Sequence, residues 1–373
     1  MDALGIIFSN IHDDNVPELT VERTMASIPF CGRYRLIDFP LSGMVNSGIS
    51  KVGVITKSNY QSLMDHVGSG KDWDLARRHG GLIILPPFGV QESKALYGTR
   101  LEALKTVTGF LAKSTEEYVI MSDSDTVCSM NCDDILDFHE KKNADITLVY
   151  VKTGSDTLCG SNNIVLGIDK SGKIDDMAFD PTYEEKQKVN LYANVCVMRR
   201  TLLQNLIADA VAHNKRHFAA DILAANLKRF RIFATEHKGY FVKISSLQSY
   251  YEESLKLLDK KKRDGLFGGG NSVYTKVKDS APTRYGENCV VKNSLIADGC
   301  EIEGEVYNSI IFRGVKIGKG TVVRDSILMQ GTITGENSLI NCIITDKNVL
   351  IKDRRMLSGC KSHPFFVYKN SVI

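Results

Sequence analysis

Residues 290–339 read VVKNSLIADGCEIEGEVYNSIIFRGVKIGKGTVVRDSILMQGTITGENSL. Apolar residues recur in this stretch at every sixth position, in three series: Val290, Ile296, Ile302; Ile311, Ile317, Val323; and Ile327, Ile333, Leu339. Turn-forming residues stand between them, as at Asp298-Gly299, Lys319-Gly320 and Gly335-Glu336. A six-residue period is typical of a parallel β-helix built from hexapeptide repeats. The stretch therefore predicts a β-helix over residues 284–373, in which every residue of the three series points inward.

Residues 1–258 show a different pattern, in which short apolar runs alternate with amphipathic stretches. The runs are rich in Ile and Val, which predicts buried strands at Leu4–Phe8, Val52–Thr56, Leu82–Leu85, Tyr118–Met121 and Ile146–Val151. Helical spacing predicts helices over Asn59–Val67, Arg100–Ala112 and Asp133–Lys142. This alternation indicates an α/β domain with a mixed, mostly parallel sheet. Ligands of such sheets bind at the carboxyl ends of the strands, so the loops after Phe8 and Met121 are the candidate functional segments.

A boundary is expected where the two patterns meet. A helix over residues 247–259 is followed by the basic run Lys260–Arg263 and the glycine-rich segment 265–270. Basic residues suit the last turn of a helix, and glycines end it. We therefore expect an α/β domain over residues 1–258, a linker over 259–283, and the β-helix with its C-terminal tail over 284–373.

Composition limits the classes of function. The 373 residues include 47 basic and 44 acidic side chains, for a formal net charge of +3. This balance gives no electrostatic reason to expect nucleic acid or a membrane as a partner. No apolar run reaches the roughly 18–20 residues of a membrane span, and the N-terminus lacks the pattern of a secretory signal. The nine cysteines form no CxxC pair, so we expect reduced, buried thiols in a cytoplasmic protein rather than a metal site.

One segment of the first domain is specific enough to suggest a family. Residues 20–57 read TVERTMASIPFCGRYRLIDFPLSGMVNSGISKVGVITK. The run from Pro29 to Ser42, continued by Asn46–Ile49, resembles the N-terminal region of bacterial and plant ADP-glucose pyrophosphorylases, or glucose-1-phosphate adenylyltransferases. The resemblance extends over nearly the whole chain. It implies a nucleotidyltransferase (Rossmann-like, GT-A-like) domain followed by a left-handed parallel β-helix.

The family's reaction converts ATP and glucose 1-phosphate into ADP-glucose and diphosphate. Such chemistry needs a glycine-rich loop that cradles the triphosphate, cations, and acidic residues that hold Mg²⁺. The family's glycine loop is replaced here by SNIHDDNVPELT, residues 9–20, which has no glycine and carries Asp13 and Asp14. We interpret this segment as an ordinary polar loop, because His12 beside two adjacent carboxylates is a weak metal pattern.

Other positions of the family's motifs are also changed. The resemblance places Arg23 in a phosphate-contacting segment whose lysine is here Met25. It matches Asp123 to the first metal aspartate, His217 to the second, and Lys243 to a sugar-site aspartate. Gly98 and Thr99 keep part of a nucleotide-binding segment that Arg100 and Leu101 break. The family's sugar-phosphate lysine has no clean counterpart, and Lys186 and Lys188 are the nearest candidates.

These losses together predict that no catalytic site is intact. The loss of a single strong electrostatic contact to a transition state costs about 2–4 kcal/mol, or roughly 100–1,000-fold in rate. The combination resembles the GlgD-type, non-catalytic subunit that accompanies a catalytic GlgC-type subunit. This implies a regulatory subunit in a hetero-oligomer, a tetramer, with a sugar-phosphate effector. Such a subunit requires no cofactor. We expect at most weak binding of Mg²⁺ and ATP at a vestigial nucleotide site that consists of Arg23, Gly98, Thr99 and Asp123. Asp123 is the one candidate metal ligand of this site.

Two alternatives remain open. The first alternative is an active nucleotidyltransferase with a rebuilt Mg²⁺–nucleotide site at Asp123 and Asp125, because Asp123-Ser124-Asp125 is a DxD triplet. We favour a solvated turn for this triplet, because DxD is short and common in loops. A hexapeptide acyltransferase is the other, but it needs a basic histidine near the coils. His363, the one histidine after residue 237, lies outside the recognised repeats.

Overall fold

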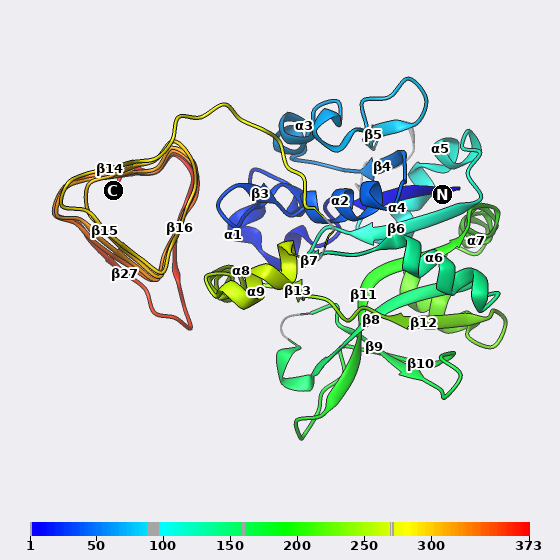
Figure 1. Ribbon diagram of the computed structural model, residues 1–373. Coiled ribbons are helices and arrows are strands. Elements are labelled where there is room, and N and C mark those ends of the chain that lie inside the picture. Colours follow the sequence, from blue (N-terminus) through cyan, green and yellow to red (C-terminus); the bar gives the residue numbers. More distant parts are fainter. Residues whose placement is uncertain (1, 88–96, 159–160, 269, 271) are drawn as a thin grey trace.

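The computed structural model describes residues 2–87, 97–158, 161–268, 270 and 272–373. Two bodies are visible in Figure 1, an α/β domain and a triangular β-helix seen along its axis. The described residues between 268 and 283, at the junction of the two bodies, form no helix or strand. Cys159, one of the nine cysteines, and Gly269 and Asn271 of the expected linker lie outside the described residues.

A mixed sheet of nine strands forms the centre of the α/β domain. Its order is β10-β9-β11-β6-β1-β4-β5, with β8 paired to β11 and β12 paired to β8. The strands are β1 Ala3–Phe8, β4 Lys51–Ile55, β5 Gly81–Leu85, β6 Tyr118–Asp123, β8 Ile146–Gly154, β9 Ile164–Ile168, β10 Ile174–Phe179, β11 Lys188–Arg199 and β12 Ile232–Glu236. The pairs β1–β4, β1–β6, β4–β5 and β8–β12 are parallel, whereas β11 runs antiparallel to β6 and β8. The predicted strands and the mixed, mostly parallel sheet are therefore confirmed.

Helices cover both faces of this sheet. Leu101 of α4 and Ile207 of α7 pack in one apolar core, and Leu41 of α2 and Ile135 of α6 pack in the other. The helices are α1 Pro17–Thr20, α2 Asp38–Asn46, α3 Gln61–Val67, α4 Arg100–Thr106, α5 Thr108–Ala112, α6 Cys132–Lys141 and α7 Arg200–Ala212. The single helix expected over Arg100–Ala112 is thus two helices that meet at Val107. Short strands complete the domain: β2 Pro29–Phe30, β3 Tyr34–Arg35, β7 Thr126–Cys128 and β13 Phe241–Lys243.

The expected helix over 247–259 is α8, Leu247–Lys256, and a further helix that was not expected, α9 Lys260–Phe267, follows it. Asp259 caps the start of α9, because its side chain accepts a hydrogen bond from the backbone N–H of Lys262. The basic run Lys260–Arg263 therefore lies in the first turn of a helix, and our placement of it in a last turn was wrong. The N-cap aspartate supplies the negative charge that the helix dipole favours there.

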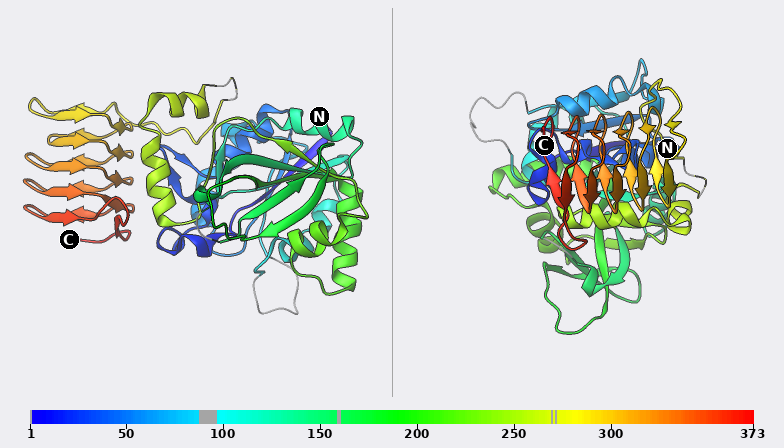
Figure 2. Two further views of the ribbon diagram at one scale, coloured as in Figure 1. Left: turned by 90° about the horizontal axis from the view of Figure 1, so that it is seen from below. Right: turned by 90° about the vertical axis from the view of Figure 1, so that its left-hand side faces the viewer.

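Three parallel sheets of five strands build the β-helix (Figures 1 and 2). The first contains β14 Arg284–Tyr285, β17 Glu301–Ile302, β20 Lys316–Ile317, β23 Ile333–Thr334 and β26 Leu350–Ile351. The second contains β15 Val290–Lys292, β18 Glu305–Tyr307, β21 Val322–Arg324, β24 Leu339–Asn341 and β27 Met356–Ser358. The third contains β16 Leu295–Ile296, β19 Ile310–Ile311, β22 Ile327–Leu328, β25 Ile343–Thr345 and β28 Phe365–Val367.

The inward register confirms one predicted series and corrects the other two. Ile296, Ile302 and the whole series Ile311, Ile317, Val323 belong to the interior core. Val290 and the series Ile327, Ile333, Leu339 do not. Their neighbours Val291, Leu328 and Ile340 point inward instead, because Val291 pairs with Val306 and Leu328 pairs with Ile311. Five positions rather than six separate Val323 from Leu328, and this shorter corner shifts the frame by one residue.

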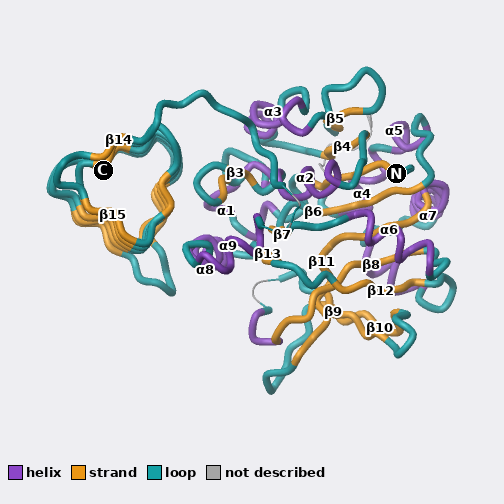
Figure 3. Tube along the Cα trace, in the orientation of Figure 1, coloured by secondary structure: helices purple, strands orange, loops and turns teal. Residues whose placement is uncertain are grey.

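The third sheet of the β-helix packs against the α/β domain. Its outward column in register is Leu295, Ile310, Ile327, Ile344 and Phe366. These side chains share one apolar cluster with Phe30 and with Tyr250 and Tyr251 of α8. Figure 3 shows α8 and α9 between the β-helix and the central sheet. The β-helix therefore carries two apolar surfaces, an interior core and an interdomain face.

Candidate functional site

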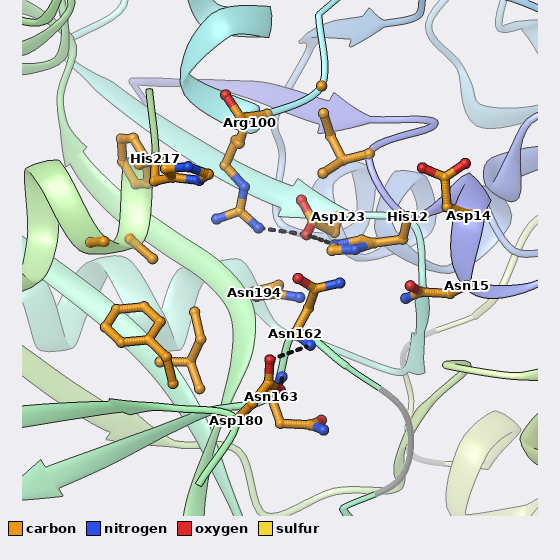
Figure 4. A pocket seen from close by; sticks show the side chains of 18 residues that line it. His12, Asp14, Asn15, Arg100, Asp123, Asn162, Asn163, Asp180, Asn194 and His217 are labelled. Carbon is orange, nitrogen blue, oxygen red and sulfur yellow. Dashed lines mark hydrogen bonds and ion pairs between the residues drawn. The ribbon is translucent and has the colours of Figure 1, made fainter. Parts of the chain in front are cut away.

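A pocket of about 370 Å³ lies at the carboxyl ends of β1 and β6 (Figure 4). These strands pair in parallel, with Phe8 opposite Asp123, so the loops that follow them meet at one edge of the sheet. The segments predicted to matter, after Phe8 and Met121, therefore do converge. The lining residues are Ile11, His12, Asp14, Asn15, Gly98, Thr99, Arg100, Asp123, Asn162, Asn163, Ile164, Phe179, Asp180, Asn194, His217, Phe218, Ala219 and Ala220. We call this cavity the β1–β6 pocket.

Arg100 is paired with Asp123, the residue that the sequence resemblance placed at a metal-ligand position. Its Nη2 lies 2.5 Å from Oδ2 of Asp123, and both side chains are largely buried. The guanidinium also lies over the rings of Phe8 and Phe218, at 5.3 and 5.9 Å from their centres. Thr99 fixes the position of Arg100, because Thr99 and Glu102 form a capping box at the start of α4. Arg100 is thus a fixed part of the pocket wall.

His12 approaches the same carboxylate from the opposite loop. Its Nε2 lies 2.6 Å from Oδ2 of Asp123 and 3.6 Å from Oδ2 of Asp125. Burial lowers the pKa of His12, but the two carboxylates outweigh it and raise this pKa above its usual value. The same contacts act in reverse on Asp123, whose pKa burial would raise but Arg100 and His12 hold below its usual range. Our interpretation of residues 9–20 as an ordinary polar loop was therefore wrong for His12.

The DxD triplet is not a solvated turn. Asp123 is 1% exposed and Asp125 is 0% exposed, so both carboxylates lie inside the protein. Burial of two adjacent carboxylates is costly unless cations pair with them. Arg100 and His12 supply those cations, and the sequence analysis treated neither side chain as part of the site.

The described side chains do not fit the Mg²⁺ that the family's reaction requires. His12, Asp123 and Asp125 place ligand atoms within 4.8 Å of one another, which is the spacing of a metal site. Mg²⁺, however, demands oxygen ligands in near-octahedral geometry and is poorly served by imidazole. Arg100 contacts the same Oδ2 atom, so its positive charge opposes a further cation there. The cluster therefore contains its own counter-charges.

The other predicted site residues divide into two groups. Gly98, Thr99 and His217 line the β1–β6 pocket together with Asp123. Met25 and Lys243 lie outside the wall of this pocket. Met25 is buried in the apolar cluster between the α/β domain and the β-helix. The Nζ of Lys243 donates a hydrogen bond to the carbonyl oxygen of Asn162 at 2.7 Å. Arg23 is not at the pocket either, since it is buried against Asp346 of the β-helix.

Asp13 supports the loop rather than the pocket. Its Oδ1 accepts the backbone N–H of Met25 at 2.7 Å. Burial raises the pKa of Asp13 to about 7, although this hydrogen bond and the charge of Lys57 act in the opposite direction. The loop from β1 is thus folded into a 3₁₀ turn, Asp13–Asn15, and the short helix α1. Residues 9–20 contain no glycine, so this loop lacks the close backbone approach with which a glycine-rich loop cradles a phosphate.

A second cavity lies between the α/β domain and the β-helix. Its wall includes six basic side chains: Arg33, Arg35, Lys276, Lys278, Arg313 and Lys347. Burial, followed by the charges of Arg35 and Arg23, lowers the pKa of Lys347 to about 7. We call this cavity the basic cleft. Its excess of positive charge suits an anion.

None of the helices in the described part of the chain combines the length and apolar composition that crossing a bilayer requires. Eight described cysteines are free, and six of them are buried. Cys289 is partly exposed and Cys360 is exposed. The burial of most of these thiols agrees with the expectation from sequence.

Comparison with known families defines the class of protein first. Residues 16–260 match the family described as nucleotidyl transferase, and residues 278–360 match the GlmU-like, C-terminal hexapeptide family. The architecture is therefore a nucleotidyltransferase domain followed by a left-handed hexapeptide β-helix.

Individual relatives narrow this class. The chain is 33% identical over 371 residues to the glycogen biosynthesis protein GlgD of Bacillus subtilis, covering 99% of this chain and 96% of the relative. It is 35% identical over 370 residues to GlgD of Geobacillus stearothermophilus, with the same coverage. It is 30% identical over 327 residues to the glucose-1-phosphate adenylyltransferase of Mycoplasma mobile, covering 87% of this chain and 85% of the relative. The chain belongs to the nucleotidyl transferase family, in the group that contains the GlgD proteins and the glucose-1-phosphate adenylyltransferases.

Proposed function

We propose that this protein acts in glycogen biosynthesis as a non-catalytic, regulatory subunit of a glucose-1-phosphate adenylyltransferase. The observation that carries the proposal is the pairing of Arg100 and His12 with Asp123. Transfer of a nucleotidyl group depends on Mg²⁺ to neutralise the charge that develops on the phosphates. Here the corresponding carboxylate is already neutralised by two side chains. The named relatives support the pathway, and the changed site supports the non-catalytic role.

Several independent contacts to the triphosphate are missing as well. The loop after β1 has no glycine, and Met25 replaces the lysine that the family aims at a phosphate. Each strong electrostatic contact is worth about 2–4 kcal/mol in a transition state. Their effects are not additive, but their joint loss is expected to leave little turnover.

Regulation requires a partner whose active state the subunit contacts more favourably than its inactive state. We propose a catalytic GlgC-type subunit as this partner, in a cytoplasmic hetero-oligomer, a tetramer. Exposed apolar side chains on the last coils of the β-helix support a docking role for this region: Ile333, Leu350, Met356 and Val372. The effector that we propose is a sugar phosphate whose phosphate group binds at the basic cleft, a cavity of about 40 Å³ between the two bodies of the chain.

The test is an ADP-glucose synthesis assay with three samples: this protein alone, a catalytic GlgC-type subunit alone, and the two co-expressed. We expect negligible turnover for this protein alone and a higher rate, a lower KM or a changed effector response for the mixture. Turnover of this protein alone at a rate similar to that of the catalytic subunit would refute the proposal. It would favour the alternative, an active enzyme with a rebuilt Mg²⁺–nucleotide site at Asp123 and Asp125.

A restoration variant tests whether the site regains activity when family residues are returned to it. The triple variant Met25→Lys/His217→Asp/Lys243→Asp returns three family residues but leaves Arg100, His12 and the glycine-free loop in place. We expect no gain in turnover from this variant, because the metal position stays blocked.

A further inference from the structure

Unpartnered polar atoms gather on the wall of the β1–β6 pocket. His12 Nδ1, Asn15 Nδ2, Asp123 Oδ1 and Asn194 Nδ2 are buried and have no hydrogen-bond partner among the described residues. Asp123 is 1% and Asn194 5% exposed. Buried polar groups in folded proteins are almost always paired, with protein or with a bound molecule. Several such atoms around one cavity point to a ligand that supplies the missing hydrogen bonds (Figure 4).

The hydrogen-bonding atoms on this wall indicate a ligand with hydroxyl groups. The amide nitrogens of Asn15 and Asn194 donate, and the carboxylate oxygen of Asp123 accepts. Nδ1 of His12 donates when the ring is protonated, the form that Asp123 and Asp125 favour. A ligand must therefore offer donors and acceptors in close succession. A hydroxyl group provides both from one oxygen atom.

The charges on the wall indicate an uncharged ligand. The cations Arg100 and His12 are already paired with Asp123 and Asp125. Lys243, beyond the wall, donates to a backbone carbonyl. In the described part of the wall, no lysine or arginine is left to pair with a phosphate, and the exposed carboxylate of Asp14 opposes an anion. Asp180 is engaged too, because it accepts the backbone N–H groups of Asn162 and Asn163.

The remaining wall is apolar and the cavity is small. Phe179 is 46% exposed and lines the pocket with Phe218, Ile11 and Ile164. A volume of about 370 Å³ lies near the lower end of the roughly 300–1,000 Å³ of small-ligand sites. An aromatic ring beside convergent hydrogen-bonding groups suits a pyranose, which has an apolar C–H face and a hydroxyl-bearing rim.

We propose that the β1–β6 pocket binds an uncharged sugar, either a monosaccharide or the end of a short glucose oligosaccharide, without a metal ion. The ligand's hydroxyl groups bond to Asn15, Asn194, Asp123 and His12, and its apolar face packs on Phe179. The inference goes beyond the proposed regulatory function and does not depend on a partner subunit.

The test is isothermal titration calorimetry on the full chain in EDTA, with glucose, maltotriose, glucose 1-phosphate, inorganic phosphate and ATP as separate probes. We expect glucose or maltotriose to bind at millimolar or lower concentration and the phosphorylated probes to bind more weakly. Tighter binding of maltotriose than of glucose identifies a chain end as the ligand, and the reverse identifies a monosaccharide. Absence of heat for both sugars, or tighter binding of glucose 1-phosphate or ATP, would overturn the proposal.

Variants locate the binding in this pocket. Asn15→Ala removes one hydrogen bond and Phe179→Ala removes the apolar wall, so each is expected to weaken sugar binding about tenfold. Asn205→Ala on α7 and Phe365→Ala on the β-helix are matched controls, because both side chains are exposed and distant from the pocket wall. All four substitutions are at partly or fully exposed positions, and thermal unfolding checks that each variant is folded. Equal binding by Asn15→Ala, Phe179→Ala and the controls would also overturn the proposal. Because the assay involves neither turnover nor a partner, its failure is distinct from failure of the proposed function.

Discussion

Arg23 of the α/β domain and Asp346 of the β-helix form a buried ion pair. Nη2 of Arg23 lies 2.7 and 2.8 Å from the two carboxylate oxygens of Asp346, and the residues are 323 positions apart in the sequence. Nη1 of Arg23 also donates to the carbonyl of Leu19. The pair thus links the loop region after β1 to the β-helix, and Arg23 serves the interdomain contact instead of the β1–β6 pocket.

Breaking this pair on one side should destabilise the protein strongly. Arg23→Met leaves the carboxylate of Asp346 buried without its main counter-ion, and removal of one partner of a buried pair costs about 3–5 kcal/mol. The double variant Arg23→Met/Asp346→Leu removes both charges and should lose less than the sum of the single variants. Urea unfolding of the four proteins gives the coupling free energy as a double-mutant cycle. Strict additivity would show that the two side chains do not act as a pair.

Removing the guanidinium from the β1–β6 pocket should create affinity for a divalent metal. Among the described side chains, Arg100→Met leaves His12 as the one cation in contact with Asp123 and Asp125, which increases the negative potential at the cluster. We expect the variant to bind Mn²⁺ at submillimolar concentration, measured from the loss of the free-ion signal in electron paramagnetic resonance. The wild-type protein should leave that signal unchanged.

Arg100→Lys is the matched control, because it keeps the positive charge at the same position. It should bind Mn²⁺ much less well than Arg100→Met. If wild type and Arg100→Met bind Mn²⁺ equally, the guanidinium does not exclude the metal.

Asp13 should make the protein less stable as the pH rises. Its pKa is about 7 in the folded protein against an ordinary 3.8, so the folded state holds a proton that the unfolded state releases in this range. The stabilisation is fully present below about pH 4 and is lost as the pH rises through 7. Asp13→Asn keeps an acceptor for the N–H of Met25 but cannot ionise, so its unfolding free energy should fall less between pH 4 and 7. Thermal unfolding at half-unit pH steps measures the slope, and an unchanged slope would contradict the assignment.

Lys347 should have the opposite effect above neutrality. Its pKa is lowered to about 7 from 10.5, so the unfolded chain holds more protons than the folded chain between these values. Stability from this group is present above about pH 10.5 and is lost as the pH falls through 7. Lys347→Met should flatten the rise in stability from pH 7 to 10, whereas Lys319→Met, at an exposed corner, should not.

Phosphate provides a second measurement on the same group. An anion in the basic cleft favours the charged form of Lys347, so inorganic phosphate should raise the melting temperature of the wild type at pH 6 more than that of Lys347→Met. Equal shifts in both proteins would place the anion elsewhere.

The general architecture was accessible from the sequence because it depends on periodicity. Alternation of apolar runs placed β1, β4, β5, β6 and β8 within a few residues, and the six-residue repeat located the β-helix. The site was less accessible, since His12, Arg100 and Asp123 lie far apart in the sequence and meet through the pairing of β1 with β6. One signal was present in the sequence. Arg100 interrupts a segment that the resemblance assigns to nucleotide binding, and an arginine at the start of a helix is a candidate counter-ion for a carboxylate that follows a neighbouring strand.

The register of the β-helix was predicted correctly from Ile296 to Val323 and fails at the corner between Val323 and Leu328. One pair of variants tests the corrected register. Ile311 is 0% exposed in the interior core, whereas Ile333 is 41% exposed on the outer face. Ile311→Ala should therefore lower the unfolding free energy by about 2–5 kcal/mol, because it leaves a cavity in a close-packed interior. Ile333→Ala should change it by less than about 0.5 kcal/mol, as expected for an exposed position. The original six-residue frame makes the two losses equal, so equal losses in urea unfolding would restore that frame and refute the shorter corner.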